Sequence, residues 1–163
     1  MTRKSSFRPV VAPDTRVLVL GSLPGERSLA AGRYYAHPQN RFWHLIGKVI
    51  DVALEPFDYE QRLAALLAAN VGLWDTVASA HRAGSLDAAI REAEANPLAD
   101  LVASLPELRV VGFNGKASAR IGMPQLAASG LALIALPSSS PANASIPLAD
   151  KEKLWGRLGE FLS

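Results

Sequence analysis

Four apolar runs of strand length alternate with helical segments along the chain, and this alternation constrains the fold more than any other feature. The runs are Val17–Gly21, Val71–Trp74, Leu108–Phe113 and Leu131–Leu136. Continuous apolar runs of this length are typical of parallel strands that are buried on both faces. Strands that alternate with helices form a parallel sheet with helices on both sides. We therefore predict an α/β protein, a three-layer α/β/α sandwich around a central, mainly parallel four-stranded sheet.

The segments between these runs predict the outer layers. We expect helices over residues 40–52, 58–70, 86–94, 97–104, 115–121 and 147–162. Residues 1–16, which include Pro9 and Pro13, are expected to form an irregular N-terminal arm. A chain of 163 residues is long enough for one hydrophobic core, so we expect a single domain over residues 1–163.

The composition excludes several classes of site. The chain has no cysteine, which excludes disulfides, thiolate zinc sites, cysteine-bound iron–sulfur clusters and a thiol nucleophile. His44 and His81 lack metal-ligand spacing, so we expect no metal and no cofactor. Lysine and arginine total 17 against 15 acidic residues, and the resulting charge of +2 does not by itself indicate a nucleic-acid partner.

The chain also carries no sequence signal for a membrane. The basic N-terminal segment has no apolar signal core, and Leu131–Leu136 is far too short to span a bilayer. We expect a cytoplasmic protein that acts as a monomer.

In open parallel sheets, ligands bind beyond the carboxyl ends of the strands. That rule selects the loops over residues 22–39, 75–82, 114–116 and 137–143, which are rich in Gly, Pro, Ser, Asn and aromatic residues. In the first of these, Gly21 and Gly25 allow a ligand to approach the backbone closely, and Pro24 stiffens the turn. The sequence therefore predicts one site, at this edge of the sheet.

Two segments of these loops have residue types suited to DNA. The aromatic run over residues 34–43 favours either stacking on a planar base or packing of a helix against the sheet. His37, in the same run, is a candidate donor to a leaving base or a phosphate. The Ser/Pro loop over residues 136–143 offers hydroxyls and backbone amides, which bind phosphate without charge, and alternatively forms a rigid turn.

Together these motifs resemble the uracil-DNA glycosylase superfamily. The matching segments are Gly-Ser-x-Pro-Gly from Gly21, Tyr-Tyr-x-His-Pro-x-Asn-x-Phe-Trp from Tyr34, and Leu-Pro-Ser-Ser-Ser-Pro-Ala-Asn from Leu136. The chain is most similar to the hypoxanthine-DNA (deoxyinosine) glycosylase branch, with mismatch-specific uracil-DNA glycosylases as relatives. The resemblance implies a monofunctional enzyme of base excision repair. It would flip hypoxanthine or uracil out of DNA and hydrolyse the N-glycosidic bond.

The resemblance also implies site residues. The first loop would approach the sugar and the flipped base, Phe42 would stack on that base, and the Ser/Pro loop would press on the DNA strand. The expected base-binding residues are Gly21, Ser22, Leu23, Pro24, Gly25, Tyr35, His37 and Phe42. The expected DNA-binding residues are Ser138, Ser139, Ser140, Pro141 and Asn143.

The catalytic residue is where the chain departs from many members of this family. Leu23 stands where they carry a water-holding Asp or Asn, and Leu136 and Ser138 replace a His or Asn of the last motif. The resemblance implies Asn40 as the residue that positions water, although Asn is also a common helix N-cap. Asp75 is the carboxylate at a strand end. It has three possible roles: to accept a hydrogen bond from a ring N–H of the base, to activate water, or to cap a turn.

Two other functions remain open at this point. One is a mismatch-directed uracil or thymine glycosylase. The other is a catalytically idle nucleic-acid-binding module on the same fold, an alternative based on Leu23 and on the missing His of the last motif.

Overall fold

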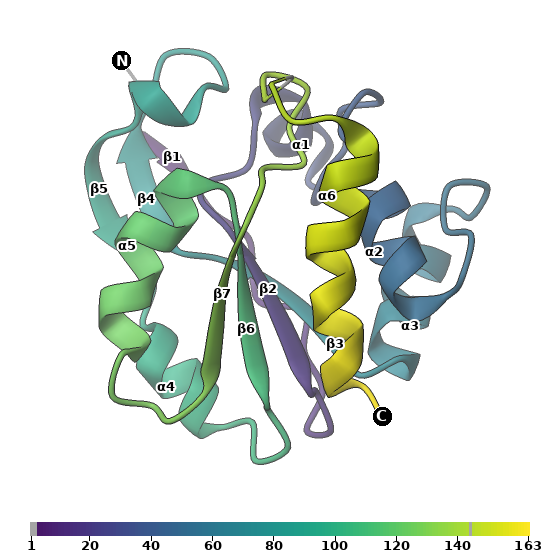
Figure 1. The fold of residues 1–163 in the computed structure, drawn as a ribbon. Helices are drawn as coiled ribbons and strands as arrows, with labels where there is room; N and C mark the ends of the chain where they lie inside the picture. Colours follow the sequence, from purple (N-terminus) through teal and green to yellow (C-terminus); the bar gives the residue numbers. More distant parts are fainter. Residues whose placement is uncertain (1–2, 144) are drawn as a thin grey trace.

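A parallel four-stranded sheet forms the centre of the protein, as seen in a computed structural model that describes residues 3–143 and 145–163 (Figure 1). Its strands are β2 (Val17–Gly21), β3 (Val71–Asp75), β6 (Val110–Asn114) and β7 (Ala132–Leu136), in the order β3-β2-β6-β7. All three neighbouring pairs are parallel. The predicted α/β sandwich around a parallel sheet is confirmed.

The alternation of side chains in β2 explains why its sequence is a continuous apolar run. Val17 and Val19 face one hydrophobic cluster, together with Phe42 and Trp155. Leu18 and Leu20 face the other cluster. Because both faces of the strand are covered, every position in it is buried and must be apolar or glycine.

Helices cover both faces of this sheet. One layer contains α2 (Phe42–Ile50), α3 (Tyr59–Ala68) and α6 (Leu148–Trp155), the last continuing as a 3₁₀ helix over Gly156–Phe161 (Figure 1). The other contains α4 (Leu98–Ala103) and α5 (Lys116–Leu126). A short helix, α1 (Glu26–Ala31), lies within a segment that we expected to be entirely loop.

Most helix boundaries follow local signals. At the start of α3, the Asp58 side chain accepts from the backbone N–H of Gln61, while the Gln61 side chain accepts from that of Asp58. The helix expected over residues 40–52 is shorter, because Asp51 adopts a left-handed conformation that ends α2.

A second, antiparallel sheet overturns three of our expectations. It consists of β1 (Arg3–Ser5), β4 (Val77–His81) and β5 (Arg91–Ala95), in the order β1-β4-β5. The N-terminal arm is therefore not wholly irregular, although residues 1 and 2 of that prediction lie outside the described residues. Residues 77–81 form a strand rather than part of a loop.

The third error is the helix predicted over residues 86–94. In its place the structure has a 3₁₀ turn, Asp87–Ala89, followed by β5. The sequence of β5, Arg-Glu-Ala-Glu-Ala, has high helix propensity, and every residue in it is exposed. Hydrogen bonding to β4 overrides that propensity, and no apolar alternation marks the strand.

Within residues 3–143 and 145–163, no helix is long and apolar enough to cross a bilayer.

Candidate active site

A cavity of about 800 Å³ opens at the carboxyl ends of the parallel strands. Its lining includes Gly21, Asp75, Asn114 and Leu136, the last residues of the four strands. Apart from Phe42, every residue that we expected in the site lines this cavity. These residues are Gly21, Ser22, Leu23, Pro24, Gly25, Tyr35, His37, Asn40, Asp75, Ser138, Ser139, Ser140, Pro141 and Asn143.

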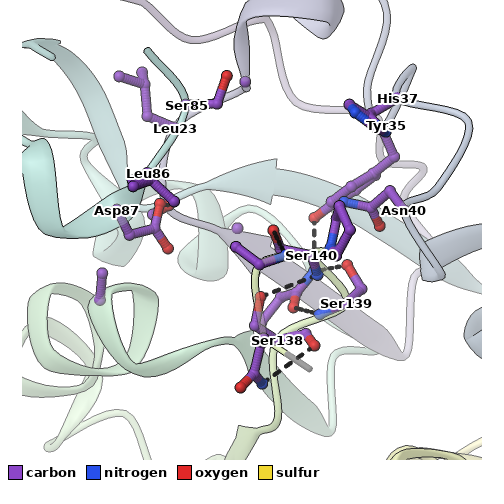
Figure 2. Close-up of a pocket in the computed structure, with 18 of the residues that line it drawn as sticks. Leu23, Tyr35, His37, Asn40, Ser85, Leu86, Asp87, Ser138, Ser139 and Ser140 are labelled. Carbon is purple, nitrogen blue, oxygen red and sulfur yellow. Dashed lines mark hydrogen bonds between the residues drawn. The ribbon is translucent and has the colours of Figure 1, made fainter. Parts of the chain in front are cut away.

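The cavity has three groups of labelled side chains (Figure 2). Tyr35, His37 and Asn40 lie on one side. Leu23 lies on the opposite side with residues 85–87, and residues 138–140 lie between the two groups. A cavity of this size with polar groups converging on it is suited to a small planar ligand.

Gly21 and Asp75 end two hydrogen-bonded neighbouring strands and lie side by side at the base of the cavity. A Cβ atom added to Gly21 would lie 2.6 Å from Asp75 Oδ1 and 3.0 Å from the Tyr35 hydroxyl. A side chain at position 21 would therefore displace two groups of the site. Glycine at this position keeps the carboxylate and the phenol close to the backbone of the first loop.

Leu23 occupies its position for a structural reason. Only 6% of its surface is exposed, and it belongs to a small hydrophobic cluster with Val77 and Ala80 of β4. The side chain therefore joins the first loop to the antiparallel sheet. A polar side chain at this position would lose that packing.

Phe42 does not line the cavity, and its expected contact with a flipped base is not supported by its position. The residue is completely buried, and its ring stacks on that of Tyr35 with 3.8 Å between centroids and 9° between planes. Tyr35 thus separates Phe42 from the cavity. Sequence patterns could not reveal that the Tyr35 ring lies between Phe42 and the cavity, because Tyr35 has a left-handed backbone conformation with a φ of 53°.

Asn40 lines the cavity and also holds the turn that precedes α2. Its Oδ1 atom accepts a hydrogen bond of 2.9 Å from the backbone N–H of Phe42, the first residue of α2. The N-cap of α2 is Arg41, one residue later, so Asn40 is not the N-cap that its residue type suggested; its contact with Phe42 fixes the turn that leads into the helix. A carbonyl oxygen has two lone pairs, so one remains for a second donor such as water.

His37 lies near Asn40 with a defined hydrogen bond. Its Nδ1 atom accepts from the backbone N–H of Gln39 at 3.1 Å. When the ring is neutral, the proton is therefore on Nε2, which leaves a donor for a ligand.

Asp75 is a buried carboxyl group whose side chain is held by the N-terminal segment. Only 3% of the residue is exposed, and Oδ2 accepts from Ser6 Oγ at 2.8 Å. Burial is the main cause that raises the pKa of Asp75 to about 7, and the charge of Asp87 adds to it. The Ser6 hydrogen bond and the charge of Arg82 oppose this increase. Near neutral pH the group is therefore present both as carboxyl and as carboxylate.

The Ser/Pro loop is fixed to the sheet by Asn114, a residue that we did not single out from the sequence. Asn114 Oδ1 accepts from the backbone N–H of Ser139 at 2.9 Å, and Nδ2 donates to Ser139 Oγ at 2.9 Å. Nδ2 also lies 3.3 Å from the Tyr35 hydroxyl. With only 1% exposure, Ser139 supports the loop rather than presenting a hydroxyl to DNA.

Ser138 and Ser140 are the available hydroxyls of this loop. Ser138 Oγ accepts from the backbone N–H of Ser140 at 3.1 Å, and Ser140 Oγ accepts from that of Ala142 at 3.2 Å. Both hydroxyls act as acceptors within the loop, so each keeps its proton for a partner. Both residues line the cavity, and Pro141 beside them is exposed.

The connection between β4 and β5 forms a wall of the cavity that the sequence did not predict. Ser85, Leu86 and Asp87 line it, and Ser22 Oγ donates to Asp87 Oδ1 at 2.5 Å. Asp75 was the carboxylate that we expected at this edge, and the structure places Asp87 on the same cavity lining. The position of Asp87 depends on a strand that lacks a hydrophobic pattern, so no signal in the sequence could have revealed it.

Arg82 holds this wall against the first loop. Its side chain is completely buried and donates to the backbone carbonyls of Leu23 at 3.1 Å, Gly84 at 2.8 Å and Pro24. A buried guanidinium with donors spread over three carbonyls cross-links two segments that are far apart in the chain.

Among the residues that the structure describes, no group of three His, Cys, Asp or Glu side chains is arranged to hold a metal ion. Lys116, the first residue of α5, places an amine on the cavity lining. The residues that line the cavity thus include amides, carboxyl groups, an imidazole and an amine.

The chain also matches known proteins over most of its length. A family model described as the uracil DNA glycosylase superfamily matches residues 8–159. A hypoxanthine DNA glycosylase of Methanosarcina barkeri (strain Fusaro / DSM 804) is 41% identical over 141 residues, covering 86% of this chain and 89% of the relative. A hypoxanthine DNA glycosylase of Methanosarcina acetivorans is 38% identical over 140 residues, covering 86% and 88% respectively.

A solved structure agrees with this. The solution NMR structure of a protein from Methanosarcina acetivorans, described as a candidate uracil DNA glycosylase, superposes with a TM-score of 0.88. The two chains are 35% identical, and the superposition covers 99% of each.

Proposed function

Because the chain belongs to the uracil DNA glycosylase superfamily and is thus a DNA glycosylase, we propose that it removes hypoxanthine, and also uracil, from DNA. The nucleotide swings out of the helix, and its base enters the cavity at the ends of the parallel strands. One observation carries this proposal. Tyr35, Asn40, Asp75 and the Ser/Pro loop, which are far apart in the sequence, line the same cavity. Hypoxanthine ranks first because the two curated relatives are named for it.

Base recognition is assigned to Tyr35 and Asp75. The Tyr35 ring lines the cavity and is supported from behind by Phe42, so it offers a fixed surface for stacking. Asp75 Oδ1 lies beside Gly21, while Oδ2 is engaged by Ser6. Ionised Asp75 would accept from the ring N–H that hypoxanthine and uracil both carry next to a carbonyl group.

Water positioning is assigned to Asn40. Its Oδ1 is fixed by the Phe42 N–H, which holds the second lone pair in a constant direction for a water molecule. The C1′–N bond breaks, its electron pair leaves with the base, and the water oxygen then forms a bond to the electron-poor C1′ of the sugar. The proton released by the water neutralises the departing base. A neutral amide adds no negative charge beside that leaving group.

The reaction is proposed to be monofunctional, without a covalent enzyme–sugar intermediate. Lys116 lines the cavity, and its amine is the group that would form such an intermediate. Borohydride should therefore fail to trap the protein on DNA during excision, and Lys116→Ala should leave the rate of base release within about threefold of wild type. Trapping that disappears in Lys116→Ala would contradict a simple hydrolysis.

DNA binding is assigned to the Ser/Pro loop. The free hydroxyl protons of Ser138 and Ser140 suit the oxygen atoms of phosphates on either side of the flipped nucleotide. Since these contacts are uncharged, binding should depend only weakly on salt, as expected for few neutralised phosphates.

The test is single-turnover excision from duplexes that contain one hypoxanthine or one uracil, followed by alkaline cleavage at the abasic site. Asn40→Ala should slow both reactions by at least about a hundredfold, with DNA affinity retained. Gln39→Ala removes the neighbouring, exposed amide and should behave like wild type. Asp75→Asn should change the ratio of the two rates, because an amide can donate as well as accept.

Two outcomes would replace this proposal. Faster release of uracil or thymine from mismatches with guanine than of hypoxanthine would favour a mismatch-directed enzyme. Tight binding of all duplexes without any base release would favour a binding module.

A further inference from the structure

The 3₁₀ turn after β4 brings the carboxylate of Asp87 to the cavity. Asp87, the first residue of the turn, is half-buried and lines the cavity wall with Ser85 and Leu86. Figure 2 shows its carboxylate on the opposite side of the cavity from Asn40. The base-recognition and water-positioning roles proposed above do not use this group.

Ser22 orients this carboxylate. Its hydroxyl donates to Asp87 Oδ1 at 2.5 Å, which joins the turn to the first loop across 65 residues of sequence. In the described part of the chain, no hydrogen bond reaches Asp87 Oδ2 and no cation forms an ion pair with it. One carboxylate oxygen is therefore held in place, and the other has no protein partner.

The surroundings of Asp87 contain both signs of charge. Burial raises the pKa of Asp87, while the Ser22 hydrogen bond and the positive charges of Arg82 and Arg120 act in the opposite direction. Arg82 is buried and uses its donors on backbone carbonyls, so its charge acts on Asp87 from a fixed position. The charge of Asp87 in turn raises the pKa of Asp75.

We propose that Asp87 is a further catalytic residue, whose free oxygen faces the sugar of the flipped nucleotide and stabilises the positive charge that develops there. The inference rests on the proposed glycosylase reaction. As the C1′–N bond breaks, its electron pair leaves with the base, and the sugar becomes cationic until the water oxygen bonds to C1′. Asp87 accepts no proton in this step. It acts by attraction alone, which is strong in a cavity that excludes water.

This role explains why Leu23 is tolerated. A carboxylate in the first loop would combine water positioning and charge stabilisation in one side chain. In this chain the two tasks are divided: Asn40 orients water from the α2 side, and Asp87 supplies the negative charge from the hairpin side. The packing of Leu23 against β4 holds the hairpin that carries Asp87.

The first test is single-turnover excision of hypoxanthine by Asp87→Asn, which keeps the shape and the Ser22 contact but removes the charge. The rate should fall by about a hundredfold, while the melting temperature changes little. Glu94→Gln is the matched control, because Glu94 lies in the same hairpin, near the Ser79 hydroxyl, outside the cavity. It should retain the wild-type rate, and an unchanged rate in Asp87→Asn would overturn the inference.

The second test separates charge stabilisation from support of the loop. Duplexes with a pyrrolidine in place of the sugar carry a cation at the position of the reacting carbon, whereas tetrahydrofuran duplexes are neutral. The wild-type protein should bind pyrrolidine DNA more tightly, and Asp87→Asn should lose about tenfold or more of that preference while its affinity for tetrahydrofuran DNA stays constant. Equal losses for both probes would mean that Asp87 only supports the loop, and would overturn the inference.

A failure of the role of Asp87 can be distinguished from a failure of the proposed function. If the wild-type protein releases neither hypoxanthine nor uracil, the proposed function fails, and the comparison of the two abasic probes still decides the role of Asp87. If the wild-type protein releases hypoxanthine and Asp87→Asn does so equally fast, the glycosylase stands and the role of Asp87 is rejected.

Discussion

The ends of the parallel strands and the connection between β4 and β5 both line the cavity, and they are held in place by different forces. Every residue of β2, β3 and β6 is buried, so the ends of these strands are fixed by hydrophobic packing on both faces. Every residue of β5 is exposed. The hairpin of β4 and β5 is joined to the first loop by a few contacts, chiefly those of Arg82, Ser22 and Leu23.

Because the two regions are held differently, we expect substitutions in them to affect different properties of the protein. The wall carrying Asp75 cannot move without disturbing the core, whereas the wall carrying Asp87 depends on contacts that one substitution can remove. We therefore expect substitutions behind the parallel sheet to act mainly on the free energy of unfolding. Substitutions in the hairpin should act mainly on the reaction.

Phe42→Ala should have the largest effect, on the parallel side. The ring is completely buried against Tyr35, Trp43 and Trp155, so its removal leaves a large cavity. We expect the free energy of unfolding to fall by about 3–5 kcal/mol, measured by chemical denaturation. Tyr35→Ala should instead weaken binding of DNA with a flipped base by about 1–3 kcal/mol. Slow excision by Phe42→Ala with unchanged stability would restore its direct contact with the base.

Asp75→Asn should change how stability depends on pH. The pKa of Asp75 is raised from its usual 3.8 to about 7, so its contribution is complete below pH 3.8 and is lost as the pH rises through about 7. A shift of this size corresponds to roughly 4 kcal/mol. The stability of Asp75→Asn relative to wild type should therefore increase by a few kcal/mol between pH 5 and pH 8.

Denaturant titrations at the two pH values measure this difference. Glu107→Gln, which alters an exposed acid, should follow the wild-type curve. Parallel curves for Asp75→Asn and wild type would mean that Asp75 titrates normally.

Arg82→Met tests the attachment of the hairpin. It leaves the carbonyls of Leu23, Pro24 and Gly84 without their donors, and we expect a loss of about 2–3 kcal/mol in stability. Excision should slow as well, because the first loop and Asp87 lose their fixed relation. Arg91→Met is the control on the same hairpin: Arg91 is exposed and bonds only to nearby carbonyls. Equal effects of the two substitutions would argue against a special role for Arg82.

Leu86→Ala should have the smallest effect on stability. Leu86 is 59% exposed at the cavity wall, and the expected change is within about 0.5 kcal/mol. Leu18→Ala, on the parallel side, should cost about 2–5 kcal/mol because Leu18 is completely buried. Similar costs for the two leucines, measured by thermal or chemical denaturation, would remove the proposed difference between the walls.

The amino-acid sequence alone determined the parallel sheet and the edge at which the cavity opens. Each of its strands carries its own apolar run, and in β2, β3 and β6 burial on both faces covers every position. The capping box at Asp58 and the turn contact between Asn40 and Phe42 are likewise local, since each joins residues only a few positions apart. The polar loops that follow the strands could be located from the same pattern.

Only the tertiary structure decided which side chains meet in the cavity. The Ser22–Asp87 contact spans 65 residues, and the contacts of Arg82 with Leu23 and Pro24 span 59 and 58. The hairpin that makes them has an exposed, helix-favouring strand, which is held by backbone hydrogen bonds to β4 and not by a hydrophobic pattern. The covering of Phe42 by Tyr35 likewise follows from one left-handed backbone conformation. Such contacts depend on distances between remote segments, which residue spacing along the chain does not encode.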